Sequence, residues 1–379
     1  MSVEFAFNAE QELLKKSARE FAETVVAPRV EQMETTGEVS WECIREMAKL
    51  GFMGVVMPRE YGGSGLGHMA RLLVISEVAR VSAAVGMTLQ ICHLGIGPVV
   101  DFGSDDQKKK FLPPLARGER LATIALTEAT GGSDPTGIQS TARLEGDDYV
   151  LNGRKVFITN SHVADVQVAV AKTGDGPRDF GAFILEKGMA GFRPGREEHK
   201  FGLLGCNTGE VILENCRVPK ANMLGTATDG LRVAMKAISD IGRMGMAACG
   251  LGMLNACLEA SVKFAKERQL RGRPIADFQA IQWKITDISA DLRAAELLCY
   301  KAAWMLDQKQ RADGDIALAK LVATEGSVRA AKLSVDIYGG YGCMKEYPVQ
   351  RFYRDAQLLI PSAGTSEVMR MVVARQALA

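Results

Sequence analysis

Two segments of the sequence combine residue types that can hold a flat, heteroatom-rich ligand. Thr127–Asp134 consists mainly of small and hydroxyl-bearing residues and follows a β-like run, Ala122–Leu126. Its N–H and O–H groups can approach a planar ring or an anionic phosphate closely, although a generic surface loop is the alternative. In Asn152–Asn160, Phe157 and Thr159 are two residues apart and therefore share one face of a strand. The ring can stack on a ligand while the hydroxyl bonds its heteroatoms, unless Phe157 belongs to the core.

Two further segments suit a phosphate-bearing ligand. Arg268–Gln279 places three arginines beside a turn, and planar guanidinium groups bind phosphates well. A solvated basic turn is the alternative. Thr365 is expected to cap the last helix, whose first N–H groups would suit a pyrophosphate. A plain capped helix is the alternative there, so no single segment identifies a ligand.

The composition is that of a soluble protein of two or three domains. The 379 residues include 47% hydrophobic and 24% charged residues. With 46 basic and 45 acidic residues, the net charge of +1 argues against bulk electrostatic binding to nucleic acid or to an acidic membrane. No apolar run approaches the roughly 20 residues of a membrane span. Met1–Phe7 does not resemble a targeting segment, so we expect a cytoplasmic protein.

Cysteine and histidine are not arranged as metal ligands. The eight cysteines contain no C-x-x-C pair and stand mostly in apolar stretches, which indicates reduced core thiols. The four histidines are scattered along the chain. We therefore expect no metal site.

Hydrophobic patterning divides the chain into three parts, which we expect to be domains. Residues 1–121 are helical in pattern, residues 122–230 alternate short strand-like runs with turns, and residues 231–379 form long amphipathic stretches. Asn152-Gly153 predicts a hairpin turn in the middle part. Long helices joined by short breaks suit a four-helix bundle. The expected fold is mainly α with a central β domain.

In order and spacing, these segments resemble the acyl-CoA dehydrogenases over nearly the whole chain. The matching signatures are Pro58–Gly67, Thr127–Asp134, Asn152–Asn160, Arg217-Val218-Pro219, Leu224-Gly225, Arg268–Gln279, Gly339–Gly342, Arg354-Asp355-Ala356 and Gly364-Thr365. The resemblance implies a helical N-terminal domain, a β-barrel-like middle domain and a C-terminal four-helix bundle, with FAD between the last two. It also implies electron-transfer flavoprotein as the redox partner and a homotetrameric assembly.

The resemblance implies roles for individual residues. Around the flavin ring it places Leu126, Thr127, Gly132 and Ser133, with Phe157 packed on the ring and Thr159 hydrogen-bonded near the reactive N5. Along the rest of FAD, partly across a dimer interface, it places Arg268, Gln279, Gly339, Gly340 and Thr365. Around the CoA thioester it places Asp240, Arg243, Ala363 and Gly364, and Ser133 also touches the CoA arm.

The sequence departs from the family where a base is expected. Most members carry a glutamate directly before the Gly-Thr pair, and this chain has Ala363 there. Others carry it before the arginine of the CoA-binding helix, and this chain has Gly242 there. Asp336 stands where Gln is common and Arg271 where Phe is common.

Three accounts of this departure stay open. Another residue can supply the base: His93 has the best pKa for it, unless it is a core histidine, while Cys92 and Asp240 are weaker candidates. The acyl group can instead be atypical, alicyclic or already unsaturated, with hydride transfer in the dehydrogenating or the enoyl-CoA-reducing direction. Finally, the chain can be a non-catalytic FAD- and CoA-binding partner subunit. An oxidase, or an enzyme for carrier-bound acyl groups, is a further reading. The expected function is an FAD-dependent oxidoreductase that transfers hydride between a carbon of an acyl-CoA and flavin N5.

Overall fold

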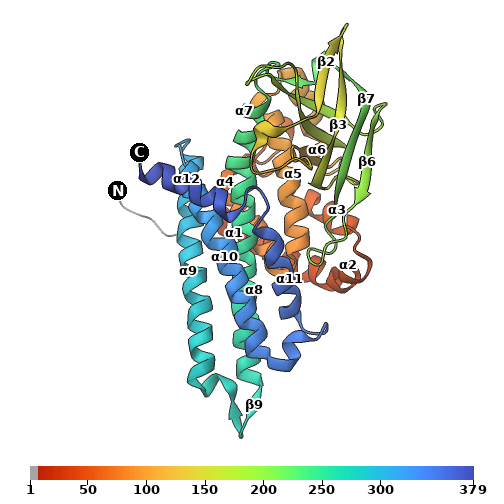
Figure 1. Cartoon of the computed structure of the whole chain (residues 1–379). Coiled ribbons are helices and arrows are strands. Elements are labelled where there is room, and N and C mark those ends of the chain that lie inside the picture. The colour runs from red at the N-terminus through yellow and green to blue at the C-terminus, as the bar shows by residue number, and fades with distance from the viewer. Residues whose placement is uncertain (1–6) are drawn as a thin grey trace.

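Helices form both ends of the chain and strands form its middle (Figure 1). The structure is a computed structural model that describes residues 7–379. The prediction that Met1–Phe7 is no targeting segment therefore lies almost wholly outside the described residues. The expected arrangement of a mainly α protein with a central β domain is confirmed.

The N-terminal helices are defined by side-chain caps that the sequence provides. They are α1 (Ala9–Phe21), α2 (Val30–Thr36), α3 (Trp41–Lys49), α4 (Gly67–Val81), α5 (Ala83–Phe102) and α6 (Asp105–Ala116). Ser40 caps α3 by accepting from the N–H of Cys43. Ser82 separates α4 from α5, because its extended backbone ends one helix and its hydroxyl caps the next.

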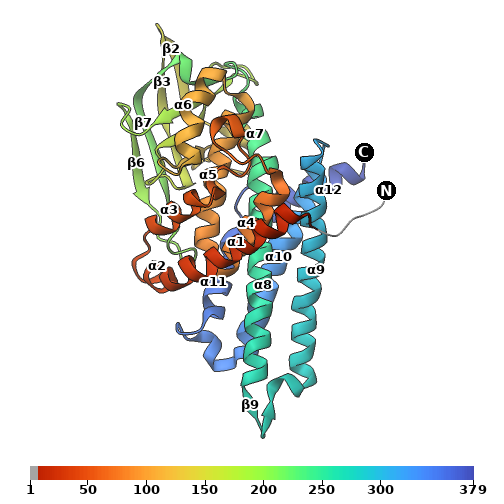
Figure 2. The ribbon, with the colours of Figure 1, turned by 180° about the vertical axis from the view of Figure 1, so that it is seen from behind.

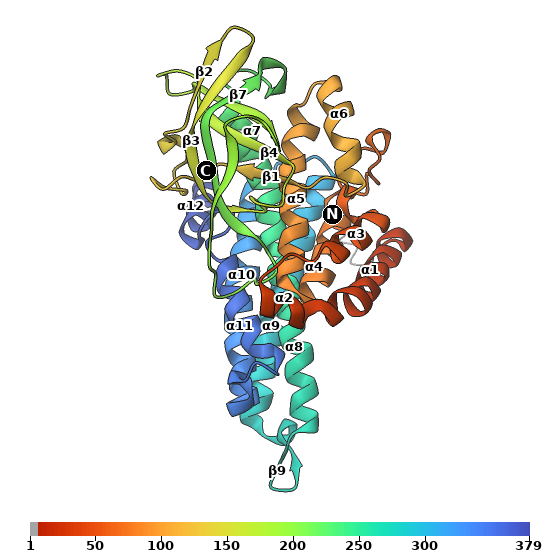
Figure 3. The same ribbon diagram turned by 90° about the vertical axis from the view of Figure 1, so that its right-hand side faces the viewer.

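The middle of the chain forms one eight-stranded sheet in the order β6-β7-β3-β2-β4-β5-β8, with β1 parallel to β4. Its strands are β1 (Ala122–Ala125), β2 (Thr141–Glu145), β3 (Asp148–Thr159), β4 (Val166–Lys172), β5 (Phe180–Glu186), β6 (Phe192–Glu197), β7 (Thr208–Pro219) and β8 (Met223–Leu224). Helices α5 and α6 lie beside this sheet (Figure 3).

The hairpin turn predicted at Asn152-Gly153 is wrong. These residues lie inside β3, and the turn between β2 and β3 falls at Gly146-Asp147 instead. The register between β3 and β7 shifts at this point, and a Cβ on Gly153 would collide with the side chain of Ser140. The glycine therefore permits an irregular strand and a close approach, rather than a turn.

The C-terminal helices pack at close range. They are α7 (Gly230–Ala237), a π-helix (Ile238–Arg243), α8 (Met244–Glu267), α9 (Gln279–Asp307), α10 (Asp313–Tyr338), α11 (Pro348–Leu359) and α12 (Ser366–Ala377), with the hairpin β9 (Gln269–Leu270) and β10 (Arg273–Pro274) after α8. A Cβ on Gly250 would lie 2.8 Å from the backbone of Ala323 on α10. A Cβ on Gly252 would lie 2.8 Å from the N of Arg80 on α4. Small residues on α8 thus let three helices meet nearly backbone to backbone.

Helices α8, α9 and α10 run side by side, with the β9 hairpin at the end of the bundle remote from the sheet (Figures 1 and 2). Ala83–Phe102 and the continuous helical stretch Gly230–Glu267 are long and apolar enough to cross a membrane by composition, but 89% and 72% of their apolar 18-residue windows are buried inside the protein. Both are core helices in this fold. Seven of the eight cysteines are buried and only Cys343 is exposed.

Candidate functional site

The loop after β1 is held on β3 by a buried ion pair. Lys155 is fully buried, and its Nζ donates to Glu128 Oε1 at 2.7 Å and to the carbonyl of Val170 at 2.6 Å. The N–H of Val156 donates to the carbonyl of Thr127 at 2.9 Å. Leu126 and Thr127, both predicted at the flavin ring, are thereby fixed against the strand that carries Phe157 and Thr159.

Glu128 also organises the far side of this loop. Its carboxylate accepts from the N–H of Gln139 at 2.6 Å and from the Ser140 hydroxyl at 2.5 Å. Burial would raise the pKa of Glu128, but the charge of Lys155 and these hydrogen bonds outweigh it and lower the pKa. The segment between, which includes the predicted residues Gly132 and Ser133, is exposed and free to meet a ligand.

Phe157 has the geometry of an aromatic platform rather than that of a core residue. Its φ is +57°, in the left-handed region that large side chains rarely adopt, at a register shift between β3 and β7. The irregularity turns the ring outward, where 67% of the residue is exposed. Backbone strain that presents an apolar ring to solvent is typical of a binding site. Thr159 follows on the same strand and pairs with Thr208 of β7.

A π-helix positions the residues predicted to meet the thioester. Arg243 ends this segment, is only 6% exposed, and its Nε is enclosed without a hydrogen-bond partner among the described residues. Burial lowers the pKa of Arg243, while Asp313 and Asp240 act in the opposite direction. Asp240 is engaged by Lys236, whose Nζ donates to it at 2.6 Å. The unpaired Nε is a donor for a ligand.

Gly242 and Ala363 face one another from different helical segments. A Cβ on Gly242 would lie 3.4 Å from the Cβ of Ala363, and the next nearest atoms are the methyl carbons of Leu94. All three neighbouring atoms are aliphatic carbons. The two positions at which the family resemblance places a carboxylate thus meet at one point, and the immediate surroundings of that point are apolar.

The turn that carries Ala363 is held by a buried lysine. Lys320 of α10 is fully buried, and its Nζ donates to the carbonyls of Ile360 and Gly364 at 2.6 and 2.8 Å. Burial lowers the pKa of Lys320 to about 8. Thr365 caps α12 as predicted, by accepting from the N–H of Val368. The hydroxyl of Ser366 beside it is enclosed and has no hydrogen-bond partner within residues 7–379.

His93 does not have the surroundings of a base, which corrects the prediction made for it. Its Nε2 donates to the carbonyl of Phe52 at 2.8 Å, so Nδ1 must be the acceptor for Arg71 Nε at 3.2 Å. Burial, and after it the charge of Arg71, lowers the pKa of His93 to about 3. Both ring nitrogens are committed to the core. Cys92 is equally buried, and burial raises the pKa of its thiol to about 12.

The remaining predicted cofactor residues form a second group at the far end of the bundle. Arg268 follows α8 and stacks over the ring of Tyr341, with its guanidinium carbon 5.2 Å from the ring centre. Gln279, Gly339 and Gly340 are exposed. Since α8 has 24 residues, about 36 Å of helix separates Arg268 from Arg243. Within one chain Arg268 therefore lies far from Arg243 and the residues predicted around the thioester.

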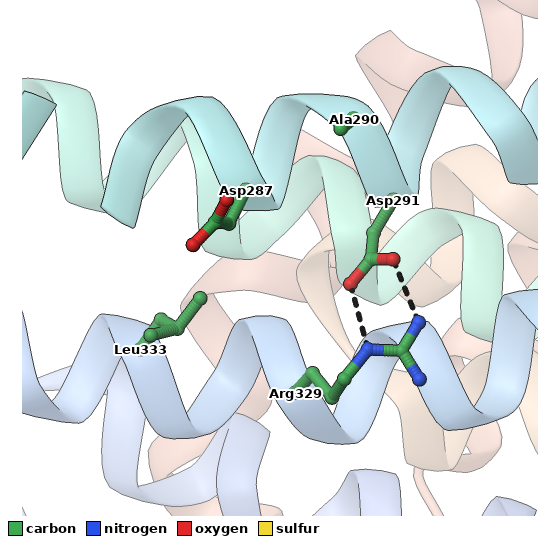
Figure 4. A pocket seen from close by; sticks show the side chains of 5 residues that line it. All are labelled: Asp287, Ala290, Asp291, Arg329 and Leu333. Atoms are coloured by element: carbon green, nitrogen blue, oxygen red, sulfur yellow. Dashed lines mark hydrogen bonds and ion pairs between the residues drawn. The ribbon is translucent and has the colours of Figure 1, made fainter. Parts of the chain in front are cut away.

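A hollow of about 290 Å³ lies elsewhere, between α9 and α10 (Figure 4). It is lined by Asp287, Ala290, Asp291, Arg329 and Leu333. Arg329 donates to both carboxylate oxygens of Asp291, at 3.1 and 2.7 Å. No predicted site residue lines this hollow.

Three polar groups that position the site were given no role from the sequence: Lys155 with Glu128, Lys320, and Arg71 with Gln90. Glu128 and Lys155 stand in the two motifs predicted around the flavin ring, but no local pattern pairs them. Lys320 interrupts an apolar stretch, Ile316-Ala317-Leu318-Ala319-Lys320, and a charge in such a stretch was the available signal. The partner is remote in sequence in every case.

Family models match three consecutive parts of the chain. They describe the N-terminal, middle and C-terminal domains of acyl-CoA dehydrogenases and match residues 8–119, 123–216 and 228–378. The chain therefore belongs to the acyl-CoA dehydrogenase family.

Its relatives include both dehydrogenases and reductases. The chain is 40% identical to a 3-(aryl)acrylate reductase of Clostridium sporogenes, over 97% of this chain and 98% of that protein. It is also 40% identical to the CarC subunit of the caffeyl-CoA reductase-Etf complex of Acetobacterium woodii, with the same coverage. Among solved structures, butyryl-CoA dehydrogenase from Megasphaera elsdenii superimposes with a TM-score of 0.97 at 37% identity, over 100% of both chains.

Proposed function

We propose that this chain is an FAD-dependent oxidoreductase of acyl-CoA thioesters and that it works chiefly as a reductase of 2-enoyl groups. When bound, the flavin supplies the hydride that is exchanged with the β-carbon of the substrate. The observation that carries the proposal is a thioester-side arginine with an unpaired, enclosed Nε next to a carboxylate-free pair, Gly242 and Ala363.

Several features fit FAD. Phe157 is an exposed aromatic held in a strained backbone conformation, and Thr159 stands two residues further along the same strand. The exposed loop around Gly132 is held on β3 by the buried ion pair between Glu128 and Lys155. The unpaired hydroxyl of Ser366 stands at the start of α12, where N–H groups suit phosphate. These residues would hold the ring and part of the phosphate chain.

The direction of the reaction follows from what the two apolar positions cannot do. Removing the α-proton of a thioester needs a base, and neither Gly242 nor Ala363 can accept a proton. In reduction, hydride addition at the β-carbon leaves a strongly basic α-carbon, which a water molecule can protonate. With water as the acid, reduction releases hydroxide, and the reverse oxidation would need that hydroxide as its base, which is scarce at neutral pH. We therefore propose reduction as the working direction. The names of the aryl-acrylate and caffeyl-CoA reductases support this direction.

A second copy of the chain would complete the site. Arg268 and Gln279 lie at the opposite end of the bundle from Thr365 and Arg243. Helix α9 also exposes four apolar residues spaced seven apart, Trp283, Ala290, Leu297 and Trp304, of which Trp283 is 63% exposed. An apolar stripe of this kind fits a helix of another copy. We propose a homotetramer in which one copy lends Arg268 to the FAD of its neighbour.

The electrons would come from a partner. The Etf complex named for the Acetobacterium woodii relative makes electron-transfer flavoprotein the proposed donor, and the proposed location is the cytoplasm.

An anaerobic titration of the purified yellow protein tests the proposal. Dithionite-reduced enzyme should be reoxidised by 2-enoyl-CoA esters, with recovery of the flavin visible band, while saturated esters should bleach the oxidised enzyme weakly. Phe157→Ala should lose flavin on gel filtration, whereas Leu144→Ala, an exposed position on β2, should retain it. Flavin that responds to no ester in either direction would leave only a binding protein.

A further inference from the structure

One buried cation near the thioester position is not used by the proposed reaction. Arg71 of α4 is 1% exposed, and its guanidinium donates only to neutral acceptors. Nε donates to His93 Nδ1 at 3.2 Å, and Nη2 donates to Gln90 Oε1 at 2.6 Å and to the carbonyl of Ile241 at 2.9 Å. Among residues 7–379, no carboxylate forms an ion pair with it.

A buried guanidinium without an anion is costly, because neutral acceptors replace only part of its hydration. The nearest titratable thiol, that of Cys249, cannot serve as the anion, since burial raises its pKa to about 12. Burial itself lowers the pKa of Arg71 to about 9, which still leaves the group charged at neutral pH. The charge therefore has no counter-ion inside the described chain.

The guanidinium of Arg71 has N–H groups that no described residue accepts. Of its five N–H groups, one on Nε and two on Nη2 are used, so the two on Nη1 have no acceptor among the described residues. Nη1 is not among the fully enclosed unpaired atoms of the described residues, so part of its surface remains accessible. A second nitrogen close to this charge, Nδ1 of His68, is enclosed and unpaired.

Arg71 is tied directly to the point where the acyl chain must begin. It holds the carbonyl of Ile241, and Gln90, which it also holds, donates to the carbonyl of Gly242 at 3.2 Å. Gly242 faces Ala363, the position proposed to border the α-carbon. An acyl chain that starts beside these two residues and continues towards α4 and α5 would bring its far end to Nη1.

We propose that Arg71 is the counter-ion for a carboxylate at the far end of the acyl chain, so that the substrate is an ω-carboxyacyl or ω-carboxyenoyl thioester. This inference rests on the proposed function, which supplies the thioester and its position. Arg71 determines specificity and takes no part in hydride transfer.

Calorimetric titration of the purified holoenzyme measures the preference without turnover. Succinyl-, glutaryl- and adipyl-CoA are compared with butyryl-, pentanoyl- and hexanoyl-CoA, which match them in chain length. At one length at least, the carboxylated ester should bind about 10- to 100-fold more tightly, as expected for a charge-assisted hydrogen bond.

Two variants test the residue. Gln90→Glu places a carboxylate where an oxygen already lies 2.6 Å from Nη2, so it neutralises Arg71 in place. It should abolish the preference, so that the carboxylated and the methyl-ended ester of each chain length bind within about threefold of one another. Arg71→Met should do the same if it folds, and Gln90→Glu decides the matter if it does not. Arg217→Gln, on an exposed arginine of β7, should keep the wild-type preference.

Equal binding of both series at all three lengths would overturn the inference, as would a preference that survives Gln90→Glu. Tighter binding of 3-(4-hydroxyphenyl)propanoyl-CoA than of every carboxylated ester would also overturn it, in favour of a neutral oxygen at this place. In these cases reoxidation of the reduced flavin by crotonyl-CoA would leave the proposed function intact. If no CoA ester binds at all, both proposals fail.

Discussion

Gly242 and Ala363, 121 positions apart in the chain, meet so closely that a Cβ on the glycine would lie 3.4 Å from that of the alanine. The π-helix brings one and the Lys320-bound turn brings the other. A carboxylate introduced at either position would therefore reach the same point.

Ala363→Glu and Gly242→Glu should each raise the rate of α,β-desaturation of a saturated acyl-CoA, by about 100-fold, which is typical of one added general base. The double variant should gain no more than the better single variant, because two carboxylates this close cannot both ionise. Anaerobic bleaching of the flavin by butyryl-CoA gives the rates. Ala363→Gln and Gly242→Gln are the matched controls without a base. If the rate gain of the double variant equalled the product of the two single gains, the two carboxylates would not reach the same point.

Ala363 also stores backbone strain, since its φ is +55°. Ala363→Gly should raise the free energy of unfolding by about 1 kcal/mol, because glycine adopts this conformation without a clash. Urea denaturation of the holoprotein measures the change. Ala303→Gly, at a buried position inside α9, should instead destabilise the fold, and a loss of stability in Ala363→Gly would show that the turn is not strained.

Much of the fold can be predicted from the hydrophobic periodicity and the turn-forming residues of the sequence. The α-β-α order, the Ser40 and Thr365 caps and most strands follow from local sequence, because each depends on neighbouring residues. The Asn152-Gly153 prediction failed because a strong turn signal was overridden by pairing of β3 with β7 on both sides of it.

The candidate site was less accessible from sequence, because its supporting contacts join distant segments. Phe157 stands in a motif, yet its positive φ depends on the register of β7. By residue type His93 is a candidate base, but Arg71 and the carbonyl of Phe52 occupy both of its ring nitrogens. Whether a polar side chain already has hydrogen-bond partners depends on the packing of distant segments, and no local sequence pattern predicts that packing.

Lys155→Met should lower the free energy of unfolding by about 3–5 kcal/mol, because it leaves the Glu128 carboxylate buried without its cation. The double variant Lys155→Met/Glu128→Gln should recover part of this loss, since the amide carries no charge. Guanidinium denaturation of the wild type, both single variants and the double variant gives the coupling energy. Arg193→Met, which breaks the exposed pair with Glu214, should cost less than about 1 kcal/mol. A double variant as unstable as the single one would show that packing, and not the uncompensated charge, sets the cost.

The buried amine of Lys320 should make stability depend on pH in the alkaline range. Its pKa is about 8 in the folded protein and 10.5 in the unfolded chain, so the unfolded state binds more protons between these values. Stability should therefore rise with pH from about 8 to 10.5, by about 3 kcal/mol. The neutral amine keeps two N–H groups, enough for the carbonyls of Ile360 and Gly364.

The measurement is the difference in unfolding free energy between wild type and Lys320→Met at pH 7, 8.5 and 10. This difference should grow towards pH 10, because the buried amine of the wild type loses its charge there and no longer destabilises the fold, whereas methionine has no charge to lose. Lys332→Met, which removes an exposed lysine paired with Asp336 on the same helix, is the control and should give no such rise. A flat difference for Lys320→Met would mean that the amine stays charged in the fold at pH 10, held by its two carbonyls.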